Sequence, residues 1–566
     1  MNKIMNKIIK ITLISVILFT LFSIISLIFF FQIDNSILYR NFSSIIKYSI
    51  TDKYEVPQRN IDILEYDLKL DISQSKKSIK ENAKIKLIIS DKNQKNIELD
   101  FYYNFEINYV KINGNETNFY YGSNKIEITN NKFFNDTLTI EIDFEGIPQN
   151  MGFGSFGVEE KNGNRFLSTL NEPIFASTWF PCNDTPADKA FATISITNDS
   201  NIVSVSNGNL INKITKGNKR TYVWKTEYPI ATYLISIYSA EFKNFSQKYI
   251  SDKDTMNIEY YVVEKNLKNA KKDFSKHPEY LRVLSEIFGE YPFIKEKYAV
   301  VEMLWQQGAM ESQTITGIGG NFISGMNFYE SMLVHEVAHH WWGNSVTPKT
   351  WKDIWLNEGF ATYSEALYFE KISGFDALKS TMNSFKSKIS SNYDKTLYNP
   401  GINLFSQTVY NKGAWVLHML RKEVGDSLFF VGLKSYYNNF KYGNADIKDF
   451  KNIMELVSNY NLDKFFNQWI YEGLGFIELD IVINEKIIYQ NEIELLINIK
   501  QVQTGYKNYY FPLDIELEDS SGIKINNSVY VKGDTTLKYN LSKPIKNILF
   551  DKDNWLLASI ETEIHK

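Results

Sequence analysis

The sequence contains little cysteine and no excess of positive charge. Cys182 is the only cysteine among 566 residues, so the chain cannot close a disulfide on itself or build a multi-cysteine metal site. Its 62 lysine and arginine residues are outnumbered by 66 aspartate and glutamate residues. With this charge balance the chain offers no excess of basic side chains to bind the phosphates of a nucleic acid, so we expect no nucleic-acid partner. Any bound metal must be held by histidine and carboxylate side chains.

Signs of disorder are also lacking. With 566 residues, of which 44% are hydrophobic and 23% charged, the chain is long enough for three or four domains with separate cores. It has no internal repeat and no low-complexity linker. Domain boundaries must therefore come from changes in the hydrophobic period.

Long apolar runs are lacking except near the N-terminus. No charged residue occurs from Ile11 to Ile33, a length that crosses a hydrocarbon core of about 30 Å as a helix. Three lysines precede this run, and no small-residue cleavage signature follows it. By the positive-inside rule, residues 1–34 are predicted to be a cytosolic start and a single-pass signal-anchor. The rest of the chain would be extracytoplasmic, with the lipid bilayer as a partner; the alternative is a secretory signal that is cleaved.

The remaining sequence divides by its hydrophobic period. After a linker at 35–59, apolar and polar residues alternate with period two, which predicts a β domain at 60–248. Helical patterns dominate from Lys265 to about Trp469, interrupted by a strand-like stretch, and the domain that contains them is placed at 249–472. Alternation returns at 473–566, which predicts a small β-sandwich. Within the first β domain, three glycine turns are expected to close hairpins: Asn113-Gly114, Gly163 and Asn207-Gly208.

Two of the six histidines enclose a glutamate at helical spacing, in His335-Glu336-Val337-Ala338-His339. A helix is predicted from Tyr329 to Trp342, where Gly343-Asn344 can end it. The i, i+4 spacing places both imidazoles on one face, as two ligands of a tetrahedral ion require, and brings Glu336 within reach of metal-bound water. The alternative is a surface helix on which these side chains are only solvated.

A carboxylate that can complete the site follows His339 after eighteen intervening residues. Glu358 stands near the start of a second helical pattern, and a helix, a turn and a return helix fit the gap. Two histidines and one glutamate leave the fourth position of a zinc ion open for water, which is typical of a catalytic site. The alternative for Glu358 is an ordinary acid favoured by the helix dipole.

These motifs resemble the aminopeptidase N family of zinc metallopeptidases, which are gluzincins. The resemblance rests on HEVAHHWWGNSVTPKTWKDIWLNEGFATYSEA at 335–366 and on three shorter segments: Gly308-Ala309-Met310-Glu311, which is similar to the family's exopeptidase signature, Val409-Tyr410-Asn411-Lys412-Gly413-Ala414, and Trp179-Phe180-Pro181-Cys182-Asn183-Asp184. It implies a multidomain α+β fold. After the N-terminal membrane helix, a β saddle domain, a thermolysin-like and mainly helical catalytic domain, and a C-terminal β-sandwich are expected.

The resemblance also implies the roles of the catalytic residues. One zinc ion (Zn²⁺) per chain would be held by His335, His339 and Glu358. Glu336 would be the general base, and the hydroxyl of Tyr410 would stabilise the oxyanion of the substrate carbonyl. A helix from about Gln407 to Val424 is expected to carry this tyrosine.

Substrate binding is implied for a second set of residues. Glu311 would pair with the free α-ammonium of a peptide, and Glu172 would be a second anchor for the same group. The small residues Gly308 and Ala309 would let the substrate backbone approach closely. Leu170 stands where several family members have glutamine, which leaves the side-chain preference open.

The sequence therefore predicts a membrane-anchored zinc aminopeptidase that hydrolyses the N-terminal peptide bond of peptides. Two alternatives stay open: a thermolysin-like endopeptidase with the same zinc site, and a catalytically silent surface-binding module on the same fold. The motifs also do not separate peptide hydrolysis from the epoxide hydrolysis known for one branch of the family. The oligomeric state is not determined by the sequence.

Overall fold

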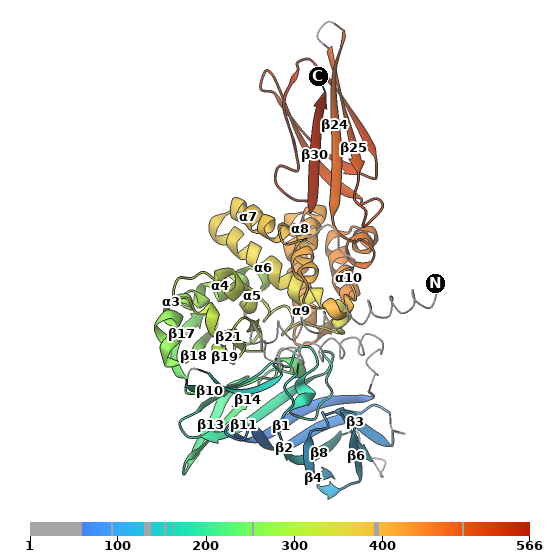
Figure 1. The fold of residues 1–566 in the computed structure, drawn as a ribbon. Helices are drawn as coiled ribbons and strands as arrows, with labels where there is room; N and C mark the ends of the chain where they lie inside the picture. The colour runs from blue at the N-terminus through green and yellow to red at the C-terminus, as the bar shows by residue number, and fades with distance from the viewer. Residues whose placement is uncertain are drawn as a thin grey trace, which may run out of the picture.

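The computed structural model describes residues 59–565, apart from 92–93, 130–136, 152–153, 162, 252–253, 390–394 and 490–491. The N-terminal β domain, the helical domain and the C-terminal β-sandwich follow one another along a long axis (Figure 1). None of the helices within the described residues is long and apolar enough to cross a membrane. The predicted membrane run from Ile11 to Ile33 lies outside them, so the anchor stays a prediction.

The N-terminal β domain is built around a large sheet that, in the described residues, has nine strands: β1 (Ile61–Ser73), β2 (Ser78–Ile89), β4 (Phe105–Ile112), β5 (Asn115–Glu116), β8 (Thr137–Gly146), β11 (Lys189–Asp199), β13 (Asn209–Lys216), β14 (Lys219–Lys225) and β15 (Ile230–Ala231). The order is β13-β14-β11-β1-β2-β8-β4-β5, and β15 pairs with β11. In β1 and β2 a buried residue recurs at nearly every second position. This period-two alternation packs one face of the sheet against a core.

Two smaller sheets complete this domain: β12 (Val203–Ser206), β16 (Ile237–Ala240), β10 (Asn164–Thr169) and β9 (Phe156–Lys161) in that order, and β3 (Asn96–Asp100), β7 (Lys125–Thr129) and β6 (Phe119–Gly122) in that order. The turns at Asn113-Gly114 and Gly163 close hairpins, as predicted. The predicted hairpin at Asn207-Gly208 is wrong, because β12 and β13 on its two sides belong to different sheets. The Asn207 amide instead donates to the carbonyls of Leu234 and Gln313, and so holds the crossing between sheets.

A third sheet joins the β domain to the helical domain. Its order is β17 (Lys243–Ile250), β18 (Thr255–Val262), β19 (Lys297–Met303), β21 (Ile315–Gly319) and β20 (Ala309–Met310). Every residue of β19 is buried, as expected of a strand covered on both faces. Tyr298 and Val300 pack into the core of the helical domain, whereas the alternate residues Ala299 and Val301 pack into that of the β domain. The sheet therefore lies between two cores.

The helical patterns form α3 (Leu267–Asp273), α4 (His277–Phe288), α5 (Glu330–Ala338), α6 (Trp355–Ser373), α7 (Phe375–Lys386), α8 (Gly413–Val424), α9 (Asp426–Phe440), α10 (Ile447–Ser458) and α11 (Asp463–Phe466). Short helical turns accompany them: η1 (Ala176–Thr178), η2 (Thr232–Leu234), η3 (Glu264–Asn266), η4 (Gly320–Phe322), η5 (Trp351–Asp353), η6 (Gly401–Asn403), η7 (Thr408–Lys412) and η8 (Asn467–Tyr471). A two-stranded sheet of β22 (Thr347–Pro348) and β23 (Asn444–Ala445) lies among them in the chain. Gly374, with φ of 84°, ends α6, because few other residues adopt this conformation.

Two of these helices differ in detail from the prediction. α5 ends at Ala338 rather than at Trp342, and tight turns lead from there to Gly343, whose φ is 113°. The Trp342 carbonyl accepts a hydrogen bond from the His339 imidazole at the end of these turns. The helix expected to carry Tyr410 is present, and it begins as the π-helical turn η7 before continuing as α8.

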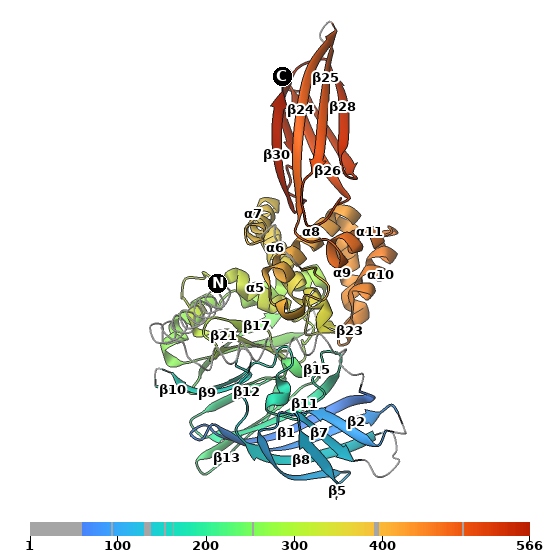
Figure 2. The ribbon, with the colours of Figure 1, turned by 45° about the vertical axis from the view of Figure 1, so that its right-hand side comes forward.

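The C-terminal part is a sandwich of two sheets, in the orders β28-β25-β24-β30 and β27-β26-β29. Its strands are β24 (Ile477–Tyr489), β25 (Glu492–Gln501), β26 (Phe511–Asp519), β27 (Lys524–Val531), β28 (Thr535–Leu541), β29 (Ile545–Phe550) and β30 (Ala558–His565). Figure 2 shows it extending away from the helices. The two parts nevertheless share one hydrophobic cluster, and the Lys412 ammonium donates to the Gly473 carbonyl at 2.7 Å where they meet.

Candidate active site

The two motif imidazoles face each other at the end of α5. The Nε2 atoms of His335 and His339 lie 2.9 Å apart. The Nδ1 atom of His335 donates to the Glu365 carboxylate at 2.9 Å, and that of His339 donates to the Trp342 carbonyl at 3.1 Å. Because both partners are acceptors, each Nδ1 carries a proton, and the Nε2 atoms are the ring atoms left to face each other and Glu358.

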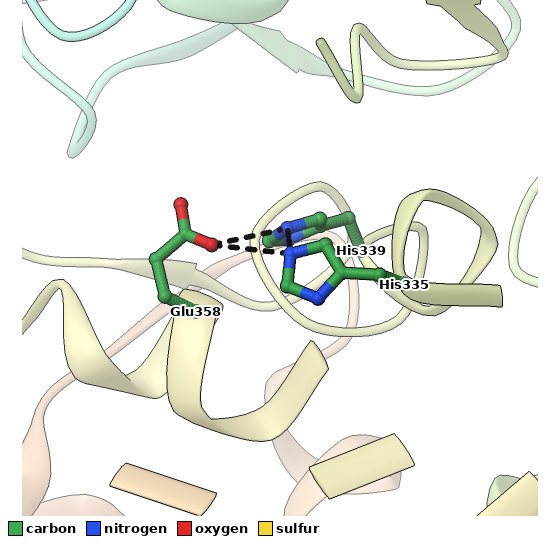
Figure 3. A group of neighbouring side chains, drawn as sticks. All are labelled: His335, His339 and Glu358. Carbon is green, nitrogen blue, oxygen red and sulfur yellow. Dashed lines mark hydrogen bonds and ion pairs between the residues drawn. The ribbon is translucent and has the colours of Figure 1, made fainter. Parts of the chain in front are cut away.

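Glu358 brings a carboxylate to the same point from the first turn of α6. Its Oε2 atom lies 3.3 Å from Nε2 of His335 and 3.4 Å from Nε2 of His339 (Figure 3). All three side chains are buried, with exposed fractions of 8%, 2% and 2% for His335, His339 and Glu358. Burial alone would raise the pKa of Glu358, but the imidazoles of His339 and His335 outweigh it and lower that pKa to about 2. The carboxylate is therefore ionised.

This group fits a zinc ion. Tetrahedral ligands at zinc distances of 2.0–2.1 Å lie about 3.3 Å from one another, close to the separations of Glu358 from the two imidazoles. The partners of both Nδ1 atoms orient the rings as metal-binding histidines require, with both Nε2 atoms turned toward Glu358. The sequence-predicted ligands therefore converge in a donor set suited to zinc.

Glu336 and Tyr410 border this group. Glu336 is 6% exposed, and one of its carboxylate oxygens is buried without a hydrogen-bond partner among the described residues. Burial raises the pKa of Glu336 to about 8, against the opposing effect of the two imidazoles. The ring of Tyr410 stacks on that of His335, with centroids 5.8 Å apart and an angle of 16° between the planes. Burial and the neighbouring carboxylates raise the pKa of Tyr410 well above its usual value, so its hydroxyl keeps a proton to donate.

A second acidic group shares Glu358. One carboxylate oxygen from each of Glu172, Glu311 and Glu358 lies within 4.8 Å of the others. Glu172 and Glu311 are 5% and 4% exposed, and each has a buried oxygen without a hydrogen-bond partner among the described residues. Burial and mutual repulsion raise the pKa of Glu172 well above its usual value, and burial raises that of Glu311. A cationic group placed here would be strongly favoured.

The predicted small residues lie at a sheet edge. Ala309 belongs to β20, the edge strand of its sheet, which pairs on one side with β21. The carbonyl of Gly308 accepts a hydrogen bond from the Gly319 amide at 2.9 Å. A Cβ atom at Gly308 would lie 2.1 Å from the Trp305 ring, so the chain has room only for glycine there. Gly308 therefore lets the Trp305 ring pack against the backbone next to β20.

Sequence reasoning missed three residues that position the site. Glu365 accepts from the His335 imidazole; its spacing of seven residues from Glu358 on one helix was the available signal, since two turns bring both to one face. Tyr233 of the β domain donates to the Gly343 carbonyl at 3.0 Å, and no local motif marks it.

The third missed residue is Asn344, in the turn after α5. Its side-chain amide donates to the Glu311 carbonyl at 2.7 Å, and its backbone amide donates to the His339 carbonyl at 3.0 Å. Its own carbonyl accepts from the ammonium of the half-buried Lys189 at 3.0 Å. This turn therefore joins a zinc-site helix, the strand end that carries Glu311, and the β domain.

Comparison with known families agrees with this geometry. The family model for the Peptidase family M1 domain matches residues 272–469, and that for the Peptidase M1 N-terminal domain matches residues 63–234. The chain belongs to peptidase family M1. The predicted resemblance to the aminopeptidase N family is thereby confirmed, and this membership implies a zinc cofactor.

Relatives of this M1 chain are distant. The alanine/arginine aminopeptidase of Saccharomyces cerevisiae is 26% identical over 510 residues, which cover 83% of this chain and 58% of the yeast protein. The chain spans between 43% and 64% of the lengths of the curated relatives that it matches. It thus corresponds to roughly half of such a protein.

Solved structures share the M1 fold. Aminopeptidase A of Legionella pneumophila aligns with a TM-score of 0.76 at 18% identity, covering 89% of this chain and 60% of that one. An M1 zinc metallopeptidase from Deinococcus radiodurans aligns with a TM-score of 0.61 at 23% identity, covering 71% and 91%. At such identities the likeness concerns the fold, so the chemistry of this chain must be argued from its own residues.

Proposed function

We propose that this protein is a zinc-dependent aminopeptidase that hydrolyses the first peptide bond of peptides with a free N-terminus. The observation that carries the proposal is that two buried groups share Glu358. One group, with His335 and His339, suits a zinc ion, and the other, with Glu172 and Glu311, suits an ammonium. The shared carboxylate holds the N-terminal charge of a peptide next to the place where its first carbonyl would react.

Glu172 and Glu311 select the substrate end in this proposal. Both carboxylates are buried and each has an oxygen without a hydrogen-bond partner among the described residues. A free α-ammonium supplies the missing positive charge, whereas an N-acetylated or internal peptide would leave two buried acids unpaired. The endopeptidase alternative provides no partner for them.

The remaining side chains supply proton transfer and positioning. Bound at its three ligands, zinc would lower the pKa of a water molecule to about 7 and polarise the peptide carbonyl. The positive charge of bound zinc would favour the ionised form of the Glu336 carboxylate. Glu336 then takes a proton from the attacking water and returns it to the leaving amine. The hydroxyl of Tyr410, kept protonated, donates a hydrogen bond to the carbonyl oxygen as negative charge develops there. The unpaired side of β20, at Gly308 and Ala309, can bind an extended peptide backbone.

The test compares short peptides that differ only in N-acetylation, incubated with the zinc-loaded full-length protein. We expect stepwise release of free amino acids from the unblocked set only. A chelator and a Glu336→Gln variant should each abolish release, the variant while keeping one zinc ion per chain. Glu561→Gln, at an exposed position on β30, is the matched control and should retain full activity.

Each other result points to a different function. Internal cleavage of the acetylated peptides would mean an endopeptidase. Failure of a folded, zinc-loaded protein to cut either set would instead support the silent binding module.

We also infer that the run from Ile11 to Ile33 anchors the protein in a membrane with the catalytic part outside the cytosol. Its length, its lack of charge and the three preceding lysines support this proposal. The protein should stay with membranes after carbonate extraction, and its N-terminal sequence should be intact. Release as a soluble protein that begins beyond residue 33 would instead show a cleaved signal.

A further inference from the structure

The acidic group beside the zinc site has an unusual charge balance. Three carboxylates, from Glu172, Glu311 and Glu358, converge within 4.8 Å in a buried setting. No lysine or arginine forms an ion pair with them in the described part of the chain, where Glu358 pairs only with the two imidazoles. Such a concentration of negative charge is costly unless a cation or protons balance it.

The unpaired oxygens point to a ligand rather than to an internal network. Glu172 and Glu311 are more than nine-tenths buried, and each has one carboxylate oxygen without a hydrogen-bond partner among the described residues. Buried acceptors of this kind are normally satisfied in a folded protein. These two belong to different domains, since Glu172 follows β10 and Glu311 follows β20, yet both reach the same point.

The geometry suits a metal ion as well as an ammonium. Oxygen ligands at about 2.1–2.6 Å from a cation can lie up to roughly 5 Å apart, which includes the spacing found here. Carboxylate oxygens without nitrogen or sulfur donors favour hard divalent ions such as Mn²⁺. A divalent ion would also balance more of the negative charge than an ammonium does.

We propose that Glu172, Glu311 and Glu358 form a second cation site, in which a hard divalent ion binds where the peptide ammonium would bind. Glu358 then serves both the zinc site and this one. Occupation by the ion excludes the N-terminus of the substrate, so divalent metal inhibits by competition. The inhibition rests on the proposed aminopeptidase function, whereas binding of the ion does not.

The test uses Mn²⁺ with the zinc-loaded full-length protein. Binding is followed by the electron paramagnetic resonance signal of free Mn²⁺, while zinc content is measured separately. Zinc should stay in place, because Mn²⁺ is the weaker ion in the Irving–Williams order. We expect one bound Mn²⁺ per chain, which alanine amide displaces and N-acetylalanine amide does not.

Variants assign the binding to this group. Glu172→Gln should weaken Mn²⁺ binding by about tenfold or more, since even indirect partners of a metal ligand contribute 10–100-fold. Glu561→Gln changes an exposed glutamate in the same way and should leave binding unchanged. If Glu172→Gln does not retain one zinc per chain, Glu311→Gln replaces it in the same comparison.

Mn²⁺ should raise KM for an unblocked peptide and leave kcat unchanged. The site is disproved if no saturable Mn²⁺ binds, if binding is equal in Glu172→Gln and the unaltered protein, or if alanine amide fails to displace the ion. A fall in kcat at saturating peptide would place the inhibitory ion elsewhere. If the protein proves to have no peptidase activity, Mn²⁺ binding and its displacement still decide this proposal separately.

Discussion

At the scale of single residues, Glu365 orients His335, one of the proposed zinc ligands. Its Oε1 accepts from His335 Nδ1 at 2.9 Å, and its other oxygen accepts from the Ser331 hydroxyl. Glu365→Gln removes the charge that fixes this ring, so zinc affinity should fall about 10–100-fold. Competition with a chelator measures this change, with Glu561→Gln as the control. Equal zinc affinity in both variants would show that Glu365 does not orient His335.

The buried imidazole of His277 should make the free energy of unfolding depend on pH. It is fully buried among the rings of Tyr260, Phe274, Tyr280 and Tyr298, and burial lowers its pKa from 6.5 to about 4. Between these values the unfolded chain binds the proton and the folded chain does not. Stability should therefore fall as pH drops below 6.5, by about 1.4 kcal/mol for each pH unit until about pH 4.

The measurement is the melting temperature of the protein and of His277→Phe at several pH values from 7.5 to 4.5. The unaltered protein should lose more stability on acidification than the variant, because Phe cannot take up the proton. Parallel curves for the two proteins would exclude this role of His277.

At the scale of elements, the turn after α5 links His339 to the strand end that carries Glu311. The Asn344 side chain donates to the Glu311 carbonyl, and Lys189 of the β domain holds the Asn344 carbonyl. Asn344→Ala should free the strand end that carries Glu311, so KM for unblocked peptides should rise about tenfold while kcat changes little. Zinc content should stay at one per chain.

The control is Asn439→Ala, which removes an exposed side chain whose amide bonds within α9. It should leave both kinetic constants unchanged. A loss of kcat without a change in KM in Asn344→Ala would contradict a role in substrate positioning.

The same scale separates what sequence patterns predict from what they miss. Period-two alternation predicted β24, β25 and β26, and the spacing from His335 to Glu358 predicted the convergence seen here, because both follow from local geometry. The crossing at Asn207 depends on hydrogen bonds to residues far along the chain, and the turn after α5 accepts one from Tyr233 at the Gly343 carbonyl. For the same reason Tyr233 carries no sequence signal, and Asn344 is marked only as a helix stop, because its contact with the Glu311 carbonyl is not local.

At the scale of the whole molecule, the boundaries between the hydrophobic cores do not coincide with the boundaries between the predicted domains. One hydrophobic cluster runs from the catalytic helices into the sandwich, where Leu495 is fully buried. A second covers the β domain and reaches one face of β19. The sequence marks changes of period, but it does not show which apolar faces meet, since that is decided only when the parts pack.

The shared cluster predicts that sandwich and catalytic domain unfold together. Leu495→Ala leaves a cavity in β25 and should destabilise this unit by about 2–5 kcal/mol. Zinc binds only the folded catalytic domain, so a chelator should lower the melting temperature of the same transition. Calorimetry of the zinc-loaded protein should therefore show a single transition whose melting temperature is lowered by Leu495→Ala and also by the chelator. The control Ile487→Ala, at a site that is 73% exposed, should leave that melting temperature unchanged. If Leu495→Ala instead shifts a transition that the chelator leaves in place, the sandwich unfolds on its own, and the continuous core does not couple it to the zinc site.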